Sequence, residues 1–182
     1  SYYVYAGPSK TSYEIGLDPV EALPLRSGIR RITLGESDIL LIGKPIVKVE
    51  SSERTIYMNL LSHSDRVVIR NGLLKDWRIK FKGAEGEDTS GGRFDEWLLT
   101  GCLTLLDMEV ENVSIHASGG RCEDSINLVR VTGELKDLQI LSAYQDAIDI
   151  DFSDVHMDLV EVHKAGNDCF DVSAGNYSVG TL

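Results

Sequence analysis

Apolar and polar residues alternate in short runs along most of the chain, without the spacing of an amphipathic helix. In the stretch AYQDAIDIDFSD (143–154), for example, Ile148, Ile150 and Phe152 alternate with Asp149 and Asp151. Alternation with a period of two predicts β-strands with one buried face and one open face. The open face of this strand would then carry like charges, which repel one another.

The alternating runs repeat along the chain. The stretches CEDSINLV (122–129), YQDAIDID (144–151) and GNDCFDVS (166–173) align at steps of 22 residues. Four columns stay in phase, namely Asp124/Asp146/Asp168, Asn127/Asp149/Asp171, Ile126/Ile148/Phe170 and Leu128/Ile150/Val172. A second apolar–turn–apolar unit recurs at 73–81, 109–117, 131–140 and 154–162, with Asp76 and Asn112 at turns and a step of 25 residues after 109–117.

A repeat of 20-odd residues that is rich in β-branched residues predicts a β-solenoid with coils of about 22–25 residues. Leucine-rich repeats have this period but need a leucine and asparagine framework that the chain lacks. An α/β sheet would need helical segments between the strands, and almost every gap is only a few residues long. The sequence therefore predicts an all-β fold in which equivalent residues stack about 4.8 Å apart.

Short strands that bend at Asn or Asp, as in EVENVSI and ELKDLQI, resemble right-handed parallel β-helix proteins of the pectate-lyase-like superfamily. The resemblance covers about 28–182, and GIRRITLGESDILLIGKPIVKV (28–49) looks like the first coil of such proteins. The repeats GNDCFDVSAG and DAIDIDFS are most similar to those of uncharacterised bacterial β-helix proteins. The Gly-His-Gly motif of polygalacturonases and the Asp-Pro-His motif of alginate epimerases are absent. The resemblance implies a carbohydrate-active protein for an extracellular polysaccharide, located in the secreted, periplasmic or cell-surface space.

Three regions stand outside the regular repeat. Residues 1–27 hold three of the four prolines and are expected to form a lead-in or an N-terminal cap. Residues 83–97 carry four glycines and five acids, which predicts a long surface loop. The sequence stops within a coil, so we expect further coils or a capping partner beyond Leu182.

The net charge of −11 and the pI near 4.7 disfavour nucleic acid and anionic membranes as partners. No apolar run is long enough for a membrane-spanning helix, so no membrane insertion is expected. Three cysteines fit no metal-binding spacing. A bridge between Cys102 and Cys122 is one option, and cysteine usage alone does not decide the compartment.

The repeated acids fall into two kinds. Asp124, Asp146 and Asp168 precede each strand, where an aspartate accepts hydrogen bonds from backbone N–H groups at a turn. Asp149, Asp151 and Asp171 are expected to point outward, and between Tyr144 and Asp171 eight acids face a single lysine, Lys164. These outward acids are either a functional site or a solvated charged face.

Two kinds of site are consistent with this pattern. A Ca²⁺ ion takes oxygen ligands and would neutralise an acidic patch, here through Asp146, Asp149, Asp168 and Asp171. Alternatively, Asp149, Asp151 and Asp171 carry out hydrolysis or β-elimination, with one carboxyl kept protonated by its neighbours and Lys164 or His163 assisting. The spacing of Asp149 and Asp151 along the strand is compatible with the separation of about 6.5–9.5 Å that marks inverting hydrolysis.

Three further residues are candidates for contact with a sugar. Arg121 can bind a sugar carboxylate or pair with Glu123 or Asp124. Tyr144 can reach the acidic face, and Trp97 can stack on a sugar ring or pack in the core. A non-catalytic module that binds a glycan or a cation, and a structural solenoid of a tail fibre or adhesin, are the alternatives to an enzyme.

Overall fold

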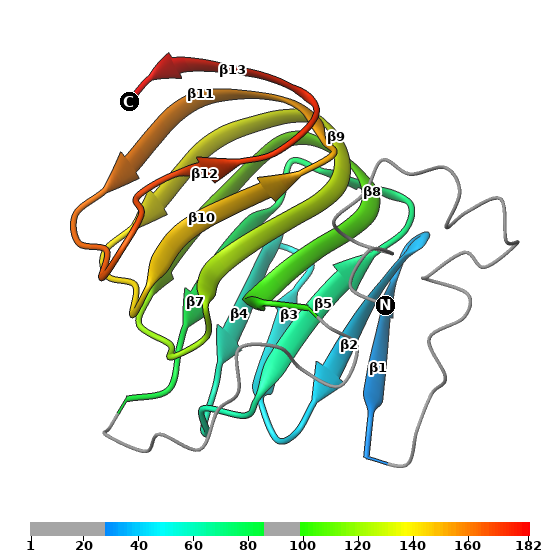
Figure 1. Cartoon of the computed structure of the whole chain (residues 1–182). Helices are drawn as coiled ribbons and strands as arrows, with labels where there is room; N and C mark the ends of the chain where they lie inside the picture. The colour runs from blue at the N-terminus through cyan, green and yellow to red at the C-terminus, as the bar shows by residue number, and fades with distance from the viewer. Residues whose placement is uncertain (1–27, 86–98) are drawn as a thin grey trace, which may run out of the picture.

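The computed structural model describes residues 28–85 and 99–182. Within these ranges the chain forms thirteen strands and no helix (Figure 1). No described segment is a helix long and apolar enough to cross a membrane. The strands are β1 (Arg30–Leu34), β2 (Ser37–Ile42), β3 (Ile46–Glu50), β4 (Thr55–Asn59), β5 (Arg66–Arg70), β6 (Leu73–Lys75), β7 (Arg78–Lys82), β8 (Gly101–Ser118), β9 (Asp124–Ile140), β10 (Asp146–Asp151), β11 (Asp154–Val162), β12 (Asp171–Val172) and β13 (Asn176–Thr181).

From β5 onward the strands stack as a parallel β-solenoid of about five turns, which confirms the predicted fold class. The coils are β5–β7, β8, β9, β10–β11 and β12–β13, and they rise toward the C-terminus at the top of Figure 1. Ile126 pairs with Ile148, and Asp149 pairs with Asn127 on one side and Asp171 on the other. The 22-residue alignment is therefore correct. Between β8 and β9, however, Ile115 pairs with Leu138, a step of 23 residues rather than the expected 25.

Each coil bends at two corners, so the stack presents three faces. The first face comprises β2, β5, the first parts of β8 and β9, β10 and β12. The third face comprises β4, β7 and the last parts of β8, β9 and β11. The second face lies between them and contains β6, the start of β11, and β13.

Residues with positive φ form the corners. Asp76 (φ 58°) and Asn112 (φ 53°) turn the chain from the second face to the third, as the sequence predicts. The Asn112 amide also donates a hydrogen bond to the Asp76 carboxylate of the neighbouring coil, at 2.7 Å. Asp137 in ELKDLQI does not form such a bend, because it lies within β9 and pairs with Ser114.

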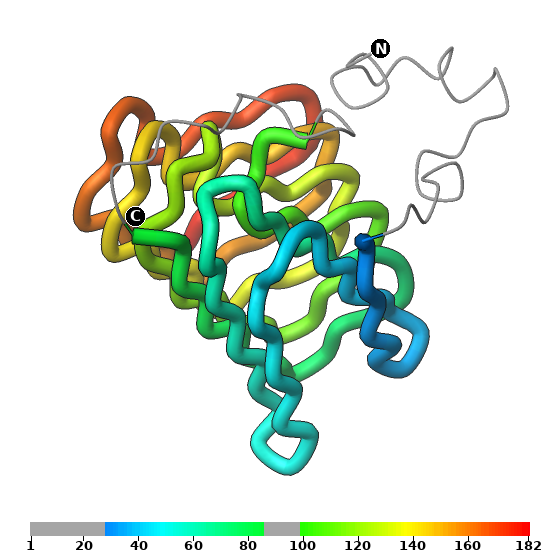
Figure 2. Tube along the Cα trace, turned by 90° about the horizontal axis from the view of Figure 1, so that it is seen from below, coloured from blue at the N-terminus to red at the C-terminus, as the bar shows by residue number. Residues whose placement is uncertain are grey.

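The N-terminal strands differ from the expected first coil. A strand does lead into a second one around Gly35, but β1 and β2 pair as an antiparallel hairpin. Strands β3 and β4 form another antiparallel hairpin. The two hairpins extend the first and third faces through the pairs β2–β5 and β4–β7, and Figure 2, seen from below, shows them at the end of the stack nearest the viewer. The segments 1–27 and 86–98, which include the expected lead-in and most of the acidic loop, lie outside the described residues.

Inward apolar columns form the core. Leu103, Ile126 and Ile148 stack in one column, and Leu105, Leu128 and Ile150 in the next, all with no exposed surface. Each fully buried side chain of this size contributes about 1.5–3 kcal/mol. Trp77 is partly buried against the same core, close to its expected inward position.

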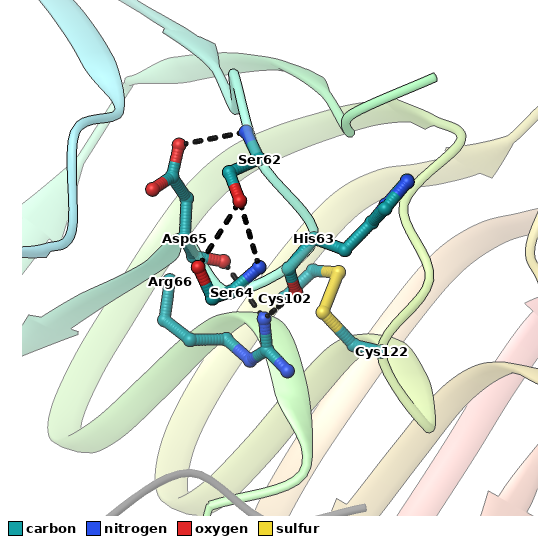
Figure 3. The surroundings of a disulfide bond; sticks show 7 residues. All are labelled: Ser62, His63, Ser64, Asp65, Arg66, Cys102 and Cys122. Carbon is teal, nitrogen blue, oxygen red and sulfur yellow. Dashed lines mark hydrogen bonds between the residues drawn. A yellow bond between two sulfur atoms is a disulfide. The ribbon is translucent and has the colours of Figure 1, made fainter. Parts of the chain in front are cut away.

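A disulfide joins Cys102, at the start of β8, to Cys122, in the loop before β9 (Figure 3). It links two neighbouring coils and lies beside the loop 61–66. In that loop the buried Asp65 accepts backbone hydrogen bonds from Lys44, Leu61 and Ser62. Cys169 is exposed and free.

Candidate functional site

The outward side of the first face carries the acids that the sequence singled out. Asn127, Asp149 and Asp171 occupy equivalent positions in three successive coils. The Asn127 amide donates a hydrogen bond to Asp149 Oδ2 at 3.2 Å. Asn127 is buried, Asp149 is half-buried and Asp171 is exposed, so accessibility increases toward the C-terminal coils.

Asp149 is the most perturbed acid of this face. Burial raises the pKa of its carboxyl group to about 8, and the charges of Asp151, Asp124 and Asp171 act in the same direction. A hydrogen bond with Asp151 also stabilises the protonated form. Near neutral pH the proton therefore stays on Asp149, next to a second carboxyl group.

Asp151 is held from both sides. It shares a hydrogen bond with Asp149, and the Ser173 hydroxyl group of the next coil donates to its Oδ1 at 2.5 Å. Two carboxyl groups in hydrogen-bond contact are closer than the separation of about 6.5–9.5 Å that inverting hydrolysis needs. In this structure Asp149 and Asp151 thus lack the spacing expected from their positions along the strand, because their side chains lean together.

The acids before each strand play a different part. Asp146 accepts hydrogen bonds from the backbone N–H of Asp168 and the side-chain amide of Asn167, at 2.9 and 2.8 Å. Asp146 is thus a backbone acceptor at a turn, but its partners lie in the next coil rather than one or two residues on. Asp124 is buried, and burial raises its pKa to about 7.

The four acids expected to bind calcium lie on two sides of the strand. Asp146 and Asp168 precede the inward positions, whereas Asp149 and Asp171 point outward. Among the residues that the structure describes, no three His, Cys, Asp or Glu side chains are placed to hold a metal ion together. Calcium binding stays a prediction.

Arg121 and Tyr144 lie together in the loops that lead into β9 and β10. The Arg121 guanidinium lies over the Tyr144 ring, 4.9 Å from the ring centroid, and Tyr144 is 50% exposed. Neither loop was expected to bring these two residues into contact. Trp97, the third candidate for contact with a sugar, lies outside the described residues.

His163 and Lys164 are not gathered around the acids. His163 is exposed and lines a groove on the third face, while Asp149 lies on the first face. Lys164 is exposed, and its backbone carbonyl accepts the N–H of Ala143. The structure therefore brings together Asp149, Asp151 and Asp171 without a basic side chain from this loop.

The groove on the third face was missed from the sequence. It has a volume of about 670 Å³ and is lined by side chains from β3, β4, β7, β8 and β9, including Lys48, Lys80, Lys82 and His116. The alternation of Ile79 and Phe81 with Lys80 and Lys82 in WRIKFK indicates that these lysines point outward. Only the stacking of the coils brings them beside His116, which pairs with Asp137.

Comparison of the chain with protein-family models, with curated proteins and with solved structures gives no significant match, so the fold and the site geometry alone support a function.

Proposed function

We propose that this protein is a carbohydrate-active β-solenoid that hydrolyses an extracellular polysaccharide on its first face. The observation that carries the proposal is the Asp149 carboxyl group, which keeps its proton near neutral pH and lies one coil from an exposed, aligned aspartate, Asp171. Resemblance of the repeats to pectate-lyase-like β-helix proteins supports the substrate class. That support comes from fold-level analogy, because one fold hosts many functions.

The geometry favours a retaining reaction. Aligned residues in neighbouring parallel strands lie about 4.8 Å apart, close to the separation of about 5–5.5 Å between the carboxyl groups of retaining glycosidases. In the proposed reaction Asp149 protonates the glycosidic oxygen while Asp171 attacks the anomeric carbon and forms a glycosyl–enzyme ester. Asp149, now ionised, then removes a proton from the water that releases the sugar. Asp151 keeps the proton on Asp149 between cycles.

The charge of the face favours a neutral sugar chain. An anionic polysaccharide would approach three aspartates that no described basic side chain neutralises by an ion pair, apart from bound cations. The exposed ring of Tyr144, held under Arg121, offers an apolar surface on which a sugar ring can stack. We therefore place hydrolysis of a neutral glycan ahead of β-elimination, which needs a uronate.

An extracellular location is part of the proposal. The Cys102–Cys122 disulfide supports it, because disulfides persist in oxidising compartments and are rare in the cytosol.

The test is a panel of neutral and acidic polysaccharides, assayed for new reducing ends and for the ultraviolet absorbance of unsaturated uronates. The proposal predicts new reducing ends from a neutral glycan, retained anomeric configuration by NMR, and loss of activity in Asp149→Asn and Asp171→Asn. Glu134→Gln, an exposed acid on the second face, is the matched control and should stay active.

Two other results would replace the proposal. Unsaturated products from an acidic glycan would assign a lyase. Binding of a glycan without any product, unchanged in the aspartate variants, would assign a non-catalytic module.

A further inference from the structure

The groove on the third face has a chemistry opposite to that of the chain as a whole. The chain has a net charge of −11, but among the described residues the groove is lined by Lys48, Lys80, Lys82, His116 and His163 and by no carboxylate. These side chains come from strands far apart in sequence that lie side by side in the stack, where β4 and β7 are seen in Figure 1. Such a local concentration of cationic groups attracts an anionic ligand.

The carboxylates near the groove are at its rim and are exchangeable. Lys48 pairs with Glu50, Lys82 pairs with Glu85, and His116 pairs with Asp137. The lysine pairs are solvent-exposed and contribute at most about 1 kcal/mol each. Lys80 forms no ion pair with a described carboxylate and lies 5.4 Å from the centroid of the Tyr57 ring. An incoming carboxylate can therefore reach Lys80 directly and compete for the other two lysines.

Apolar side chains at both ends of the groove distinguish between anionic ligands. Ile46 on β3 is 56% exposed, and Leu141, just after β9, is 61% exposed. Four strand spacings separate them along the stack, or about 19 Å at about 4.8 Å per strand. Large aliphatic side chains contribute binding energy when an apolar group covers them. A sugar chain that carries only hydroxyl and acidic groups would leave both uncovered.

We propose that this groove binds an extended acidic peptide segment of a partner protein, with apolar side chains near both ends of the bound stretch. About six extended residues span 19 Å at about 3.3 Å per residue. The central carboxylates of the segment would contact Lys80, Lys82 and Lys48, and its apolar ends would cover Ile46 and Leu141. This site lies on a different face from Asp149 and does not depend on the proposed hydrolysis.

The test is a selection from a phage-displayed library of random peptides against the purified chain, followed by fluorescence anisotropy with the consensus peptide. We expect enrichment of peptides with clustered acids between apolar residues. Their Kd should rise about tenfold or more in the Lys80→Gln/Lys82→Gln variant, and about as much in Ile46→Ser/Leu141→Ser. Lys75→Gln is the matched control, because Lys75 is exposed and paired with Glu111 on the second face, and it should bind normally.

Three results would overturn the proposal. One is a selection without acidic peptides, and another is binding that the groove variants leave unchanged. The third is binding of polygalacturonate that weakens in the lysine variant but not in Ile46→Ser/Leu141→Ser, which would assign the groove to an anionic glycan. Circular dichroism and thermal melting of each variant separate these results from misfolding.

Discussion

At the scale of single residues, burial and neighbouring charge give Asp149 its chemistry. The pKa of this carboxyl group rises from 3.8 to about 8, mainly because the group is partly removed from water and secondarily because Asp151, Asp124 and Asp171 are close. The alternation of acids with apolar residues predicts the outward position of Asp149. Its contact with Asp151 could not be predicted, because side-chain rotamers and burial depend on the packed coils.

The raised pKa has a consequence for stability. Between about pH 4 and pH 8 the folded state keeps a proton on Asp149 that the unfolded state releases, so the free energy of unfolding falls as the pH rises through this window. Asp124 adds to this fall up to about pH 7. We predict a melting temperature several degrees higher at about pH 5 than at about pH 8, and a smaller difference in Asp149→Asn.

Differential scanning calorimetry across this range checks the prediction, with Glu134→Gln as the control. An Asp149→Asn variant that loses as much stability between the two pH values as the original chain would mean that Asp149 titrates normally in the fold.

At the scale of strands and corners, the corner residues define where each coil turns. Asn112 adopts a left-handed conformation and also bonds to Asp76 of the neighbouring coil. We predict that Asn112→Ala lowers the free energy of unfolding by about 1–2 kcal/mol, from backbone strain and the lost hydrogen bond. Asn112→Gly should cost less, because glycine accepts this conformation. Equal losses in the two variants, measured by urea unfolding, would show that the corner carries no strain.

How far the sequence predicts the strands depends on their periodicity. The columns through Ile126, Ile148 and Phe170 follow from a constant step of 22 residues, and register pairing confirms them. The hairpins at β1–β2 and β3–β4 do not follow, since alternation marks a strand but not the direction of its partner. Likewise, the lysine groove is visible in one strand only, whereas five strands build it.

At the scale of the whole molecule, the disulfide ties two coils that otherwise contact each other through backbone ladders and core packing. It closes a stretch with a sequence separation of 20 residues. We predict that Cys102→Ser/Cys122→Ser lowers the free energy of unfolding by about 3 kcal/mol, because the unfolded chain gains freedom. Cys169→Ser, which removes an exposed free thiol group, is the control and should melt normally. An unchanged melting temperature in the double variant would mean that the two thiols are not bonded in solution.

Calcium is also tested on the whole molecule. If the acids of the first face bind Ca²⁺, the melting temperature rises with Ca²⁺ concentration at constant ionic strength and falls back with EDTA. The rise should grow with pH, because binding requires Asp149 to release its proton. The absence of a shift at both about pH 6 and about pH 9 would remove calcium from the account.

The most direct test of the central claim is the ionisation of Asp149, followed through its carboxyl ¹³C chemical shift in an NMR titration. The account predicts a midpoint near 8 for Asp149, and a lower midpoint in Asp151→Asn because a neighbouring charge is removed. A midpoint near the ordinary value of 3.8 would contradict it, since Asp149 would then have no proton to donate at neutral pH and the first face would be a solvated acidic surface.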